Sequence, residues 1–121
     1  MAIRVQNVDG VALEPWEPEG LEVLEGDPQT RGHIFFESGP DGGGFGPGGT
    51  VVGVYEQQPC KTRYRLVQTE TVHLLDGDIQ IELDNGESVG LRPGEITVLE
   101  KGNVSTWAFR SASRVLFVLS P

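Results

Sequence analysis

The sequence predicts an all-β fold, an antiparallel sandwich or barrel, on three observations. Glycine and proline account for 17 and 8 of the 121 residues, and they divide the chain into short segments. The segments between them are rich in valine, isoleucine, threonine and aromatic residues, which suit half-buried strands. No window of adequate length carries the apolar stripe of an amphipathic helix. A single β domain therefore accounts for the whole pattern.

Eight of these segments are expected to be strands. In chain order they are His33–Glu37, Thr50–Glu56, Thr62–Val67, Thr71–Leu75, Ile79–Leu83, Ile96–Leu99, Val104–Phe109 and Val115–Leu119. The segment Gly20–Gly26 has room for one helical turn at most. The chain length suits one domain. We divide it into an acidic N-terminal arm, residues 1–30, that packs on a barrel formed by residues 31–121.

Three turn signals connect the later strands. Asp84-Asn85-Gly86 stands between alternating apolar residues, and Asn-Gly predicts a type I′ hairpin turn. Asp76-Gly77-Asp78 and the segment from Arg92 to Glu95 predict two further tight turns. Their spacing of about nine residues is typical of consecutive antiparallel strands.

A glycine-rich loop, Gly39–Gly49, interrupts the strands. It contains the pattern G-x-G-x-x-G at Gly44, Gly46 and Gly49, but the β-branched run Thr50-Val51-Val52 follows it. A dinucleotide site needs a helix at that point, so the pattern does not indicate one. We interpret the loop as a connection, with a lid over a site as the alternative.

Composition excludes several classes of function. The formal net charge of −9 argues against nucleic acids and anionic membranes as partners, since both attract basic surfaces. The single cysteine, Cys60, excludes an internal disulfide framework. No apolar run is long enough to span a membrane, and the start of the chain has no pattern of a secretory signal. We therefore expect a cytoplasmic protein.

From Thr69 onward the chain resembles the cupins. The resemblance rests on Glu70 followed after six residues by Gly77, then Asn85-Gly86, Pro93-Gly94-Glu95, Gly102 and Trp107. It covers about residues 50–119 and is greatest for small single-domain cupins of the ureidoglycine aminohydrolase type. It implies a double-stranded β-helix, or jelly-roll barrel, with a site in its interior.

The resemblance also implies where metal ligands would lie. Metal cupins carry two histidines seven and five residues before the glutamate and a third three residues after the second-motif glycine. In this chain those positions hold Arg63, Arg65 and Ser105, so of the four ligands only Glu70 remains. The chain has two histidines in all, too few for a three-histidine site. We therefore expect no metal and no other cofactor.

The family pattern places Arg63 and Arg65 inside the barrel near Glu70, together with Ser105 and Trp107. Because guanidinium groups match carboxylates and carry fixed charge, this set predicts binding of a small anion. Glu70 would act as general acid or base.

Three alternatives concern the same residues. The arginines could lie on the outer face, or pair with Glu70 and Glu100 only structurally, and Trp107 could serve as core. Tyr64, between the arginines, is expected to point opposite to them and to pack. His73 has the wrong parity to join Glu70, and Cys60 is expected to be a buried or edge thiol.

Two classes of function remain open. One is an enzyme that acts on a small polar metabolite through Glu70, and the other is a non-catalytic sensor or structural cupin. A metal-dependent enzyme like ureidoglycine aminohydrolase is a third alternative. We also expect a homodimer, because both faces of the last strand, Val115–Leu119, are apolar and one of them needs a cover.

Overall fold

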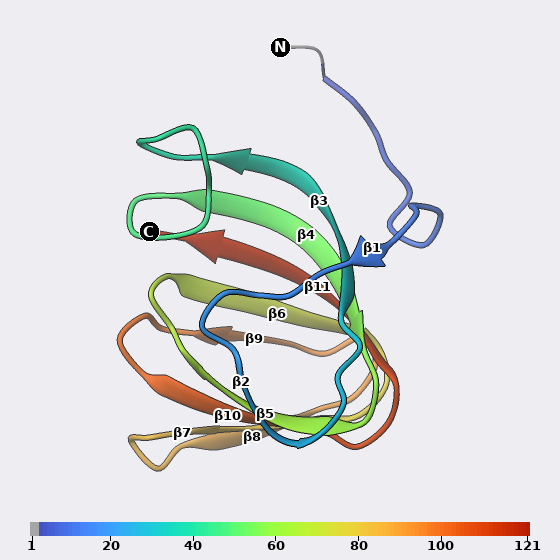
Figure 1. Cartoon of the computed structure of the whole chain (residues 1–121), viewed down its shortest axis with the longest axis vertical. Helices are drawn as coiled ribbons and strands as arrows, with labels where there is room; N and C mark the ends of the chain where they lie inside the picture. Colours follow the sequence, from blue (N-terminus) through green and yellow to red (C-terminus); the bar gives the residue numbers. More distant parts are fainter. Residues whose placement is uncertain (1–2) are drawn as a thin grey trace.

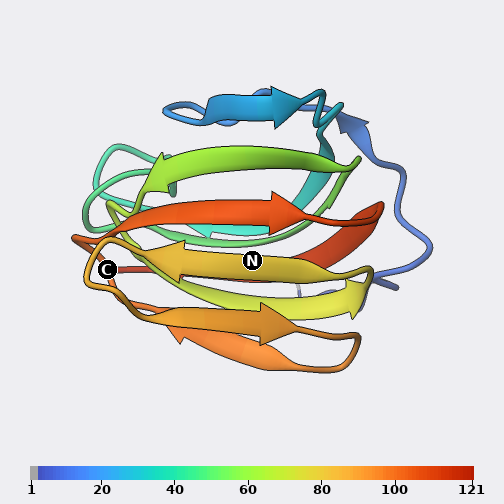
Figure 2. The ribbon, with the colours of Figure 1, turned by 90° about the horizontal axis from the view of Figure 1, so that it is seen from below.

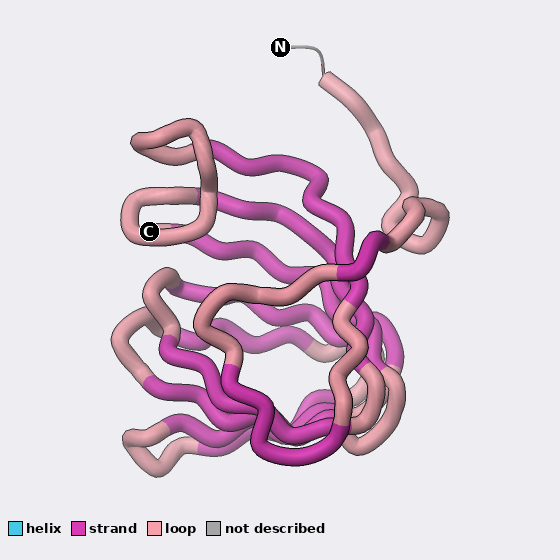
Figure 3. Tube along the Cα trace, viewed as in Figure 1, coloured by secondary structure: helices cyan, strands magenta, loops and turns pink. Residues whose placement is uncertain are grey.

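The computed structural model describes residues 3–121, and every regular element in that range is a β-strand (Figures 1 and 3). The all-β prediction is confirmed. The strands form two antiparallel sheets that face one another. No helix of the described residues is long and apolar enough to cross a membrane.

The first sheet has six strands. In spatial order these are β1 (Glu14–Pro15), β3 (Arg31–Ser38), β4 (Thr50–Gln57), β11 (Ser113–Ser120), β6 (Thr69–Asp76) and β9 (Ile96–Leu99). The second sheet has five, which are β2 (Glu22–Gly26), β5 (Cys60–Arg65), β10 (Val104–Phe109), β7 (Ile79–Leu83) and β8 (Ser88–Leu91). Figure 2 shows the five-stranded sheet from below.

The chain changes sheet at most of its connections. Within residues 3–121, only two pairs of consecutive strands are hydrogen-bonded neighbours, β3 with β4 and β7 with β8. Of the three predicted turns, the one at Asp84–Gly86 therefore joins paired strands. The turns at residues 76–78 and 92–95 carry the chain from one sheet to the other, so the prediction of consecutive paired strands was wrong there. This alternation between sheets is typical of a jelly roll.

The β7–β8 hairpin also differs from the predicted turn type. A type I′ turn needs positive φ at both Asn85 and Gly86. Gly86 has φ of 94°, but Asn85 does not have positive φ, since Gln29 is the one described non-glycine residue that does. The amide of Gly86 donates to the carbonyl of Leu83 at 3.0 Å. The connection is therefore a three-residue loop, a type I turn closed by a left-handed glycine.

The first thirty residues contribute an edge strand to each sheet. β1 pairs with β3, and β2 pairs with β5 with an irregular register between Val23 and Glu25. Gly20–Gly26, expected to hold a helical turn at most, therefore mainly forms a strand. Arg114 on β11 ties down the preceding segment, since its guanidinium donates to the Val8 carbonyl and pairs with Asp9 and Glu56.

The apolar core lies between the sheets. β11 shows the arrangement clearly, since Val115, Phe117 and Leu119 are buried while the residues between them are half-buried on the outer face. β6 alternates in the same way, with Glu70, Val72 and Leu74 inward. Period-two alternation is the expected signature of a sheet with one buried face.

Candidate functional site

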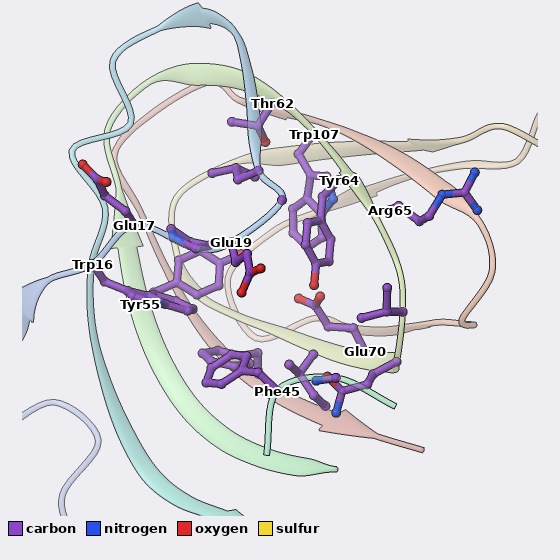
Figure 4. A pocket seen from close by; sticks show the side chains of 18 of the residues that line it. Trp16, Glu17, Glu19, Phe45, Tyr55, Thr62, Tyr64, Arg65, Glu70 and Trp107 are labelled. Carbon is purple, nitrogen blue, oxygen red and sulfur yellow. The ribbon is translucent and has the colours of Figure 1, made fainter. Parts of the chain in front are cut away.

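A cavity of about 650 Å³ lies between the two sheets (Figure 4). Residues from both sheets, from the β1–β2 connection and from the glycine-rich loop line it. They include Trp16, Glu17, Glu19, Phe45, Tyr55, Gln57, Thr62, Tyr64, Arg65, Gln68, Glu70, Trp107, Phe109, Phe117 and Leu119. This size is in the range of pockets that hold small organic molecules.

Aromatic side chains make up much of the cavity wall. On the side of the six-stranded sheet, Trp16 stacks on Phe117 with ring centroids 5.9 Å apart and meets Tyr55 edge-on at 6.2 Å. Phe45, from the glycine-rich loop, lies 5.9 Å from Trp16. On the side of the five-stranded sheet, Trp107 stacks on Phe109 at 5.8 Å. Such pairs contribute stability beyond the area that they bury.

Two glycines make room for these rings. A Cβ on Gly53 of β4 would lie 2.8 Å from Cζ of Phe117, and one on Gly32 of β3 would lie 3.0 Å from Cε3 of Trp16. Any larger residue would push the ring away from the strand surface. The position of these aromatic rings therefore depends on the two glycines that lie beneath them as well as on the rings themselves.

Among the described residues that line the cavity, Glu70 carries the one buried carboxyl group, with 7% of its surface exposed. Its neighbours across the six-stranded sheet are Leu99 of β9 and Leu119 of β11, both apolar. In the part of the chain that the structure describes, the carboxyl group makes no hydrogen bond and no ion pair. Burial alone raises its pKa from 4.5 to about 8. Glu70 is therefore mainly neutral at pH 7.

Two tyrosines share the environment of Glu70. Burial, followed by the nearby Glu70, raises the pKa of Tyr55 well above its usual value. Burial raises the pKa of Tyr64 as well, with further contributions from Glu70 and Glu19. Figure 4 shows the Tyr64 phenol directed toward the Glu70 carboxyl group. Both phenols are thus neutral hydrogen-bonding groups at physiological pH.

Gln68 holds the glycine-rich loop against the cavity. Its Nε2 donates to the carbonyls of Gly44 and Gly49, both at 2.8 Å, and its Oε1 accepts from the amide of Gly46 at 2.8 Å. The loop thereby supplies Phe45, Gly46 and Pro47 to the cavity wall. The interpretation of this loop as a mere connection was incomplete, since it forms part of the site.

The predicted placement of the two arginines inside the barrel was wrong. Arg63 is exposed on the outer face, where its Nη1 lies 3.7 Å from Oε2 of Glu22 on β2. Arg65 is also exposed and lies at the rim of the cavity, and Figure 4 shows its guanidinium directed away from Glu70. The inward residues of β5 are Cys60, Thr62 and Tyr64.

The error came from the spacing of the family motif. That motif puts its two inward positions seven and five residues before Glu70, and both separations are odd. Strict alternation from Glu70 would instead turn Tyr64, Thr62 and Cys60 inward, as the structure does. Counted within β5 alone, the charged residues fall outside.

Ser105 and Trp107 act together beneath the cavity surface. The Ser105 hydroxyl is fully buried, donates to the Tyr64 carbonyl and accepts from Nε1 of Trp107, both at 2.8 Å. Ser105 is not among the cavity-lining residues, whereas Trp107 is. Ser105 therefore orients the indole and holds strands β5 and β10 together, and its hydroxyl has little left to offer a ligand.

Two further residues considered in the sequence, His73 and Cys60, do not line the cavity. His73 lies on the outer face of β6, half-buried. Cys60 is buried, and burial followed by the nearby Asp27 raises the pKa of its thiol to about 11. A thiol in that state is a poor nucleophile at neutral pH.

The residues around Glu70 do not fit a metal ion. Among residues 3–121 no group of three or more His, Cys, Asp or Glu side chains is close enough to hold one. Of the positions that the resemblance assigns to histidine, Arg63 points outward and the Ser105 hydroxyl is engaged within the protein. Stable sites for zinc, iron or manganese need three or more good donors.

Sequence reasoning missed most of the aromatic wall. Trp16, Phe45, Tyr55 and Phe117 come from four segments distant in sequence, and the fold alone brings them together. Tyr64 had a usable signal, since it alternates with the charged residues of its strand. Of the predicted set, the structure brings Glu70 and Trp107 together at the cavity and leaves Arg65 at its rim.

Comparison with known proteins places this architecture in a family. The model of the EutQ-like cupin domain matches residues 46–114, more than half of the chain. No match is found among curated proteins. Solved structures with the same fold are numerous, and three of them illustrate its range.

The cupin domain of Cnp3 from Schizosaccharomyces pombe superimposes with a TM-score of 0.66 at 13% identity, over 94% of this chain and 71% of that one. Ectoine synthase from P. lautus gives a TM-score of 0.65 at 16% identity, over 98% of this chain and 78% of that one. The ethanolamine utilization protein EutQ from Salmonella typhimurium gives a TM-score of 0.62 at 17% identity, over 76% of this chain and 69% of that one. At such identities the likeness shows the fold alone. The jelly-roll topology and the family match together establish that this chain belongs to the cupins, in the family of EutQ-like cupin domains.

Proposed function

We propose that the barrel cavity binds a small organic molecule, with the aromatic wall holding its apolar part and Glu70 anchoring its polar group. The observation that carries the proposal is the state of Glu70. Its side chain is 7% exposed, and its carboxyl group lines the cavity without an ion-pair partner, so it offers a polar anchor to a ligand there. The lining residues leave room for such a ligand beside it.

The anion expected from the sequence loses its basis, because that expectation required both arginines inside. Arg63 pairs with Glu22 on the surface, and Arg65 points away from Glu70. We therefore assign the polar anchor to Glu70 and the wall to the aromatic residues.

Both tryptophans of the chain, Trp16 and Trp107, line the cavity, so intrinsic fluorescence reports on its occupancy. The test uses monocyclic aromatic probes that each carry one polar group: benzyl alcohol, benzamide, benzylamine and benzoate. We expect at least one probe to change tryptophan emission saturably. Glu70→Gln should change its Kd severalfold, because the anchoring group is altered.

Glu82→Gln is the matched control, since Glu82 is exposed on the outer face of β7 and the charge change is the same. It should leave the Kd unchanged. If no probe gives a saturable change at millimolar concentration, or if the two variants behave alike, the cavity is not a binding site anchored by Glu70.

A second candidate function is acid–base catalysis by Glu70, and the pKa of about 8 favours it. A catalytic group works best when its pKa lies near the working pH. A bound probe that is turned over should then give a pH–rate profile with an inflection near that pKa. Glu70→Gln should abolish turnover. A metal-dependent reaction like that of ureidoglycine aminohydrolase is disfavoured by the donor set around Glu70.

We also propose a homodimer formed through the outer face of the six-stranded sheet. Ile96 and Val98 of β9 are 61% and 56% exposed there, and Thr71 of β6 lies between Val98 and half-buried Val118 of β11. Two copies would cover this apolar surface. Light scattering at micromolar concentration should give twice the chain mass of 13.1 kDa, and the monomer mass would refute the dimer.

A further inference from the structure

Carboxyl groups outnumber basic groups at the cavity. Glu70 lies on the wall and the exposed Glu19 of the β1–β2 connection lies at the mouth, whereas the Glu17 carboxylate extends away (Figure 4). The one basic group that lines the cavity, Arg65, extends away from Glu70 (Figure 4). The field inside the cavity therefore favours positive charge.

The groups that face Glu70 from other elements are neutral at physiological pH. They are the phenols of Tyr55 on β4 and Tyr64 on β5, while the register partners on β9 and β11 are leucines. The Tyr64 phenol is directed toward the carboxyl group (Figure 4), but no described residue places a positive charge beside it. A bound molecule is left to supply that charge.

Aromatic faces supply the second independent feature. Trp16, Tyr55 and Phe117 pack into one cluster on the six-stranded sheet, and Trp107 and Tyr64 line the opposite wall. Ring faces carry partial negative charge and attract organic cations, most strongly where water is excluded. Anions are not favoured by such a wall.

We infer that the ligand of this cavity is a small organic cation, an ammonium compound with a compact apolar body. Its N–H groups donate to the Glu70 carboxylate, and its body lies against the aromatic faces. The inference rests on the proposed binding function of the same cavity and names its ligand class. The cavity volume of about 650 Å³ suits a free small amine.

Binding of a cation entails loss of a proton from the protein. Free Glu70 is mainly protonated at pH 7, because burial raises its pKa to about 8. An ammonium group beside it stabilises the carboxylate, so the carboxyl O–H proton goes to solvent as the cation binds. The affinity for a cation should therefore rise with pH up to about 8 and level off above it.

Calorimetry of the full chain with three probes of similar shape tests the inference: benzylammonium, benzyl alcohol and benzoate. At pH 8 benzylammonium should bind at least about tenfold more tightly than benzyl alcohol, and benzoate should bind more weakly than either. Between pH 6 and 7 the Kd of benzylammonium should fall by nearly tenfold per pH unit. Titrations in buffers of different ionisation enthalpy should show close to one proton released at pH 7.

Glu70→Gln should remove the preference for benzylammonium, the pH dependence and the proton release, and should leave benzyl alcohol binding within about threefold of the original. Glu82→Gln should retain all three. Equal affinity for alcohol and ammonium, or a preference for benzoate, would overturn the cationic ligand while leaving a binding cavity. A preference for ammonium that survives Glu70→Gln would overturn the pairing of the cation with Glu70. Absence of binding by all three probes would instead overturn the binding function itself.

Discussion

Strands β5 and β6 lie in opposite sheets, follow one another in the chain, and place their ionisable side chains in opposite ways. β6 turns Glu70 into the barrel, where it has no partner among the described residues. β5 turns Arg63 and Arg65 outward, where Arg63 pairs with Glu22 in solvent. The inward positions of β5 hold small or neutral side chains, Cys60, Thr62 and Tyr64.

The difference follows from what each group can do when it loses water. A carboxyl group can take up a proton and become neutral, and the raised pKa of Glu70 records that exchange. A guanidinium cannot lose its proton under ordinary conditions, so a buried arginine keeps its full desolvation cost. A cupin barrel can therefore hold a lone glutamate more readily than a lone arginine.

The largest expected effect is the dependence of stability on the protonation of Glu70. Its pKa of about 8 in the folded state lies above the ordinary 4.5, so the folded protein binds more protons between these pH values. The stability that protonation of Glu70 contributes to the fold is fully present below pH 4.5 and is lost as pH rises through about 8. In urea unfolding, the free energy of unfolding of Glu70→Gln should rise, relative to that of the original protein, by on the order of 4 kcal/mol from pH 5 to pH 8.5.

Glu82→Gln should show no such gain, because Glu82 is exposed. The pKa values of Tyr55 and Cys60 are raised above this range, so these groups do not titrate within it. A difference between Glu70→Gln and the original protein that stays constant with pH would show that Glu70 is ionised in the fold.

The next effect, somewhat smaller, comes from placing an arginine where β5 now has a neutral side chain. Thr62→Arg turns a guanidinium into the barrel and should lower the free energy of unfolding by about 3 kcal/mol. Thr106→Arg makes the same chemical change on the outer face of β10, away from the proposed dimer surface, and should cost less than about 1 kcal/mol. Equal costs in chemical denaturation would contradict the assignment of inward and outward faces.

A third effect tests the segment that joins the two strands. Gln68→Ala removes three hydrogen bonds to the glycine-rich loop and should cost about 2 kcal/mol. Hydrogen exchange at the Gly46 amide should speed up, because its acceptor is lost. Gln58→Ala, at an exposed position, is the control and should change neither measurement. Unchanged exchange at Gly46 would show that Gln68 does not hold the loop.

The same two strands show how far the sequence determines the site. β6 was predictable in detail, because Glu70, Val72 and Leu74 alternate within one unbroken strand. β5 was predicted with the wrong face inward, because the family's spacing of seven and five residues before Glu70 selects Arg63 and Arg65, which lie at odd separations from it. Within β5 itself, charged residues at every second position indicate the outward face correctly.

Other parts of the site depend on contacts that no local pattern encodes. Phe45 reaches the cavity because the Gln68 side chain pins its loop, and Trp16 because Gly32 leaves space beneath the ring. β2 belongs to a sheet through backbone pairing with β5, although its sequence has no clear apolar alternation. The fold class was predictable because many strands share one signal, whereas each of these contacts occurs once.

The smallest expected effect concerns Arg63 itself. Its ion pair with Glu22 spans 3.7 Å between side chains that are about half exposed, and pairs of this kind contribute little. Arg63→Ala should therefore change the free energy of unfolding by less than about 0.5 kcal/mol, and Glu22→Ala should do the same. The double variant should show no coupling beyond that range. Probe binding in the cavity should stay unchanged in all three, since neither side chain reaches it. A severalfold loss of affinity in Arg63→Ala alone would place this guanidinium near the ligand, and β5 would then resemble β6 in bringing an ionisable group to the site.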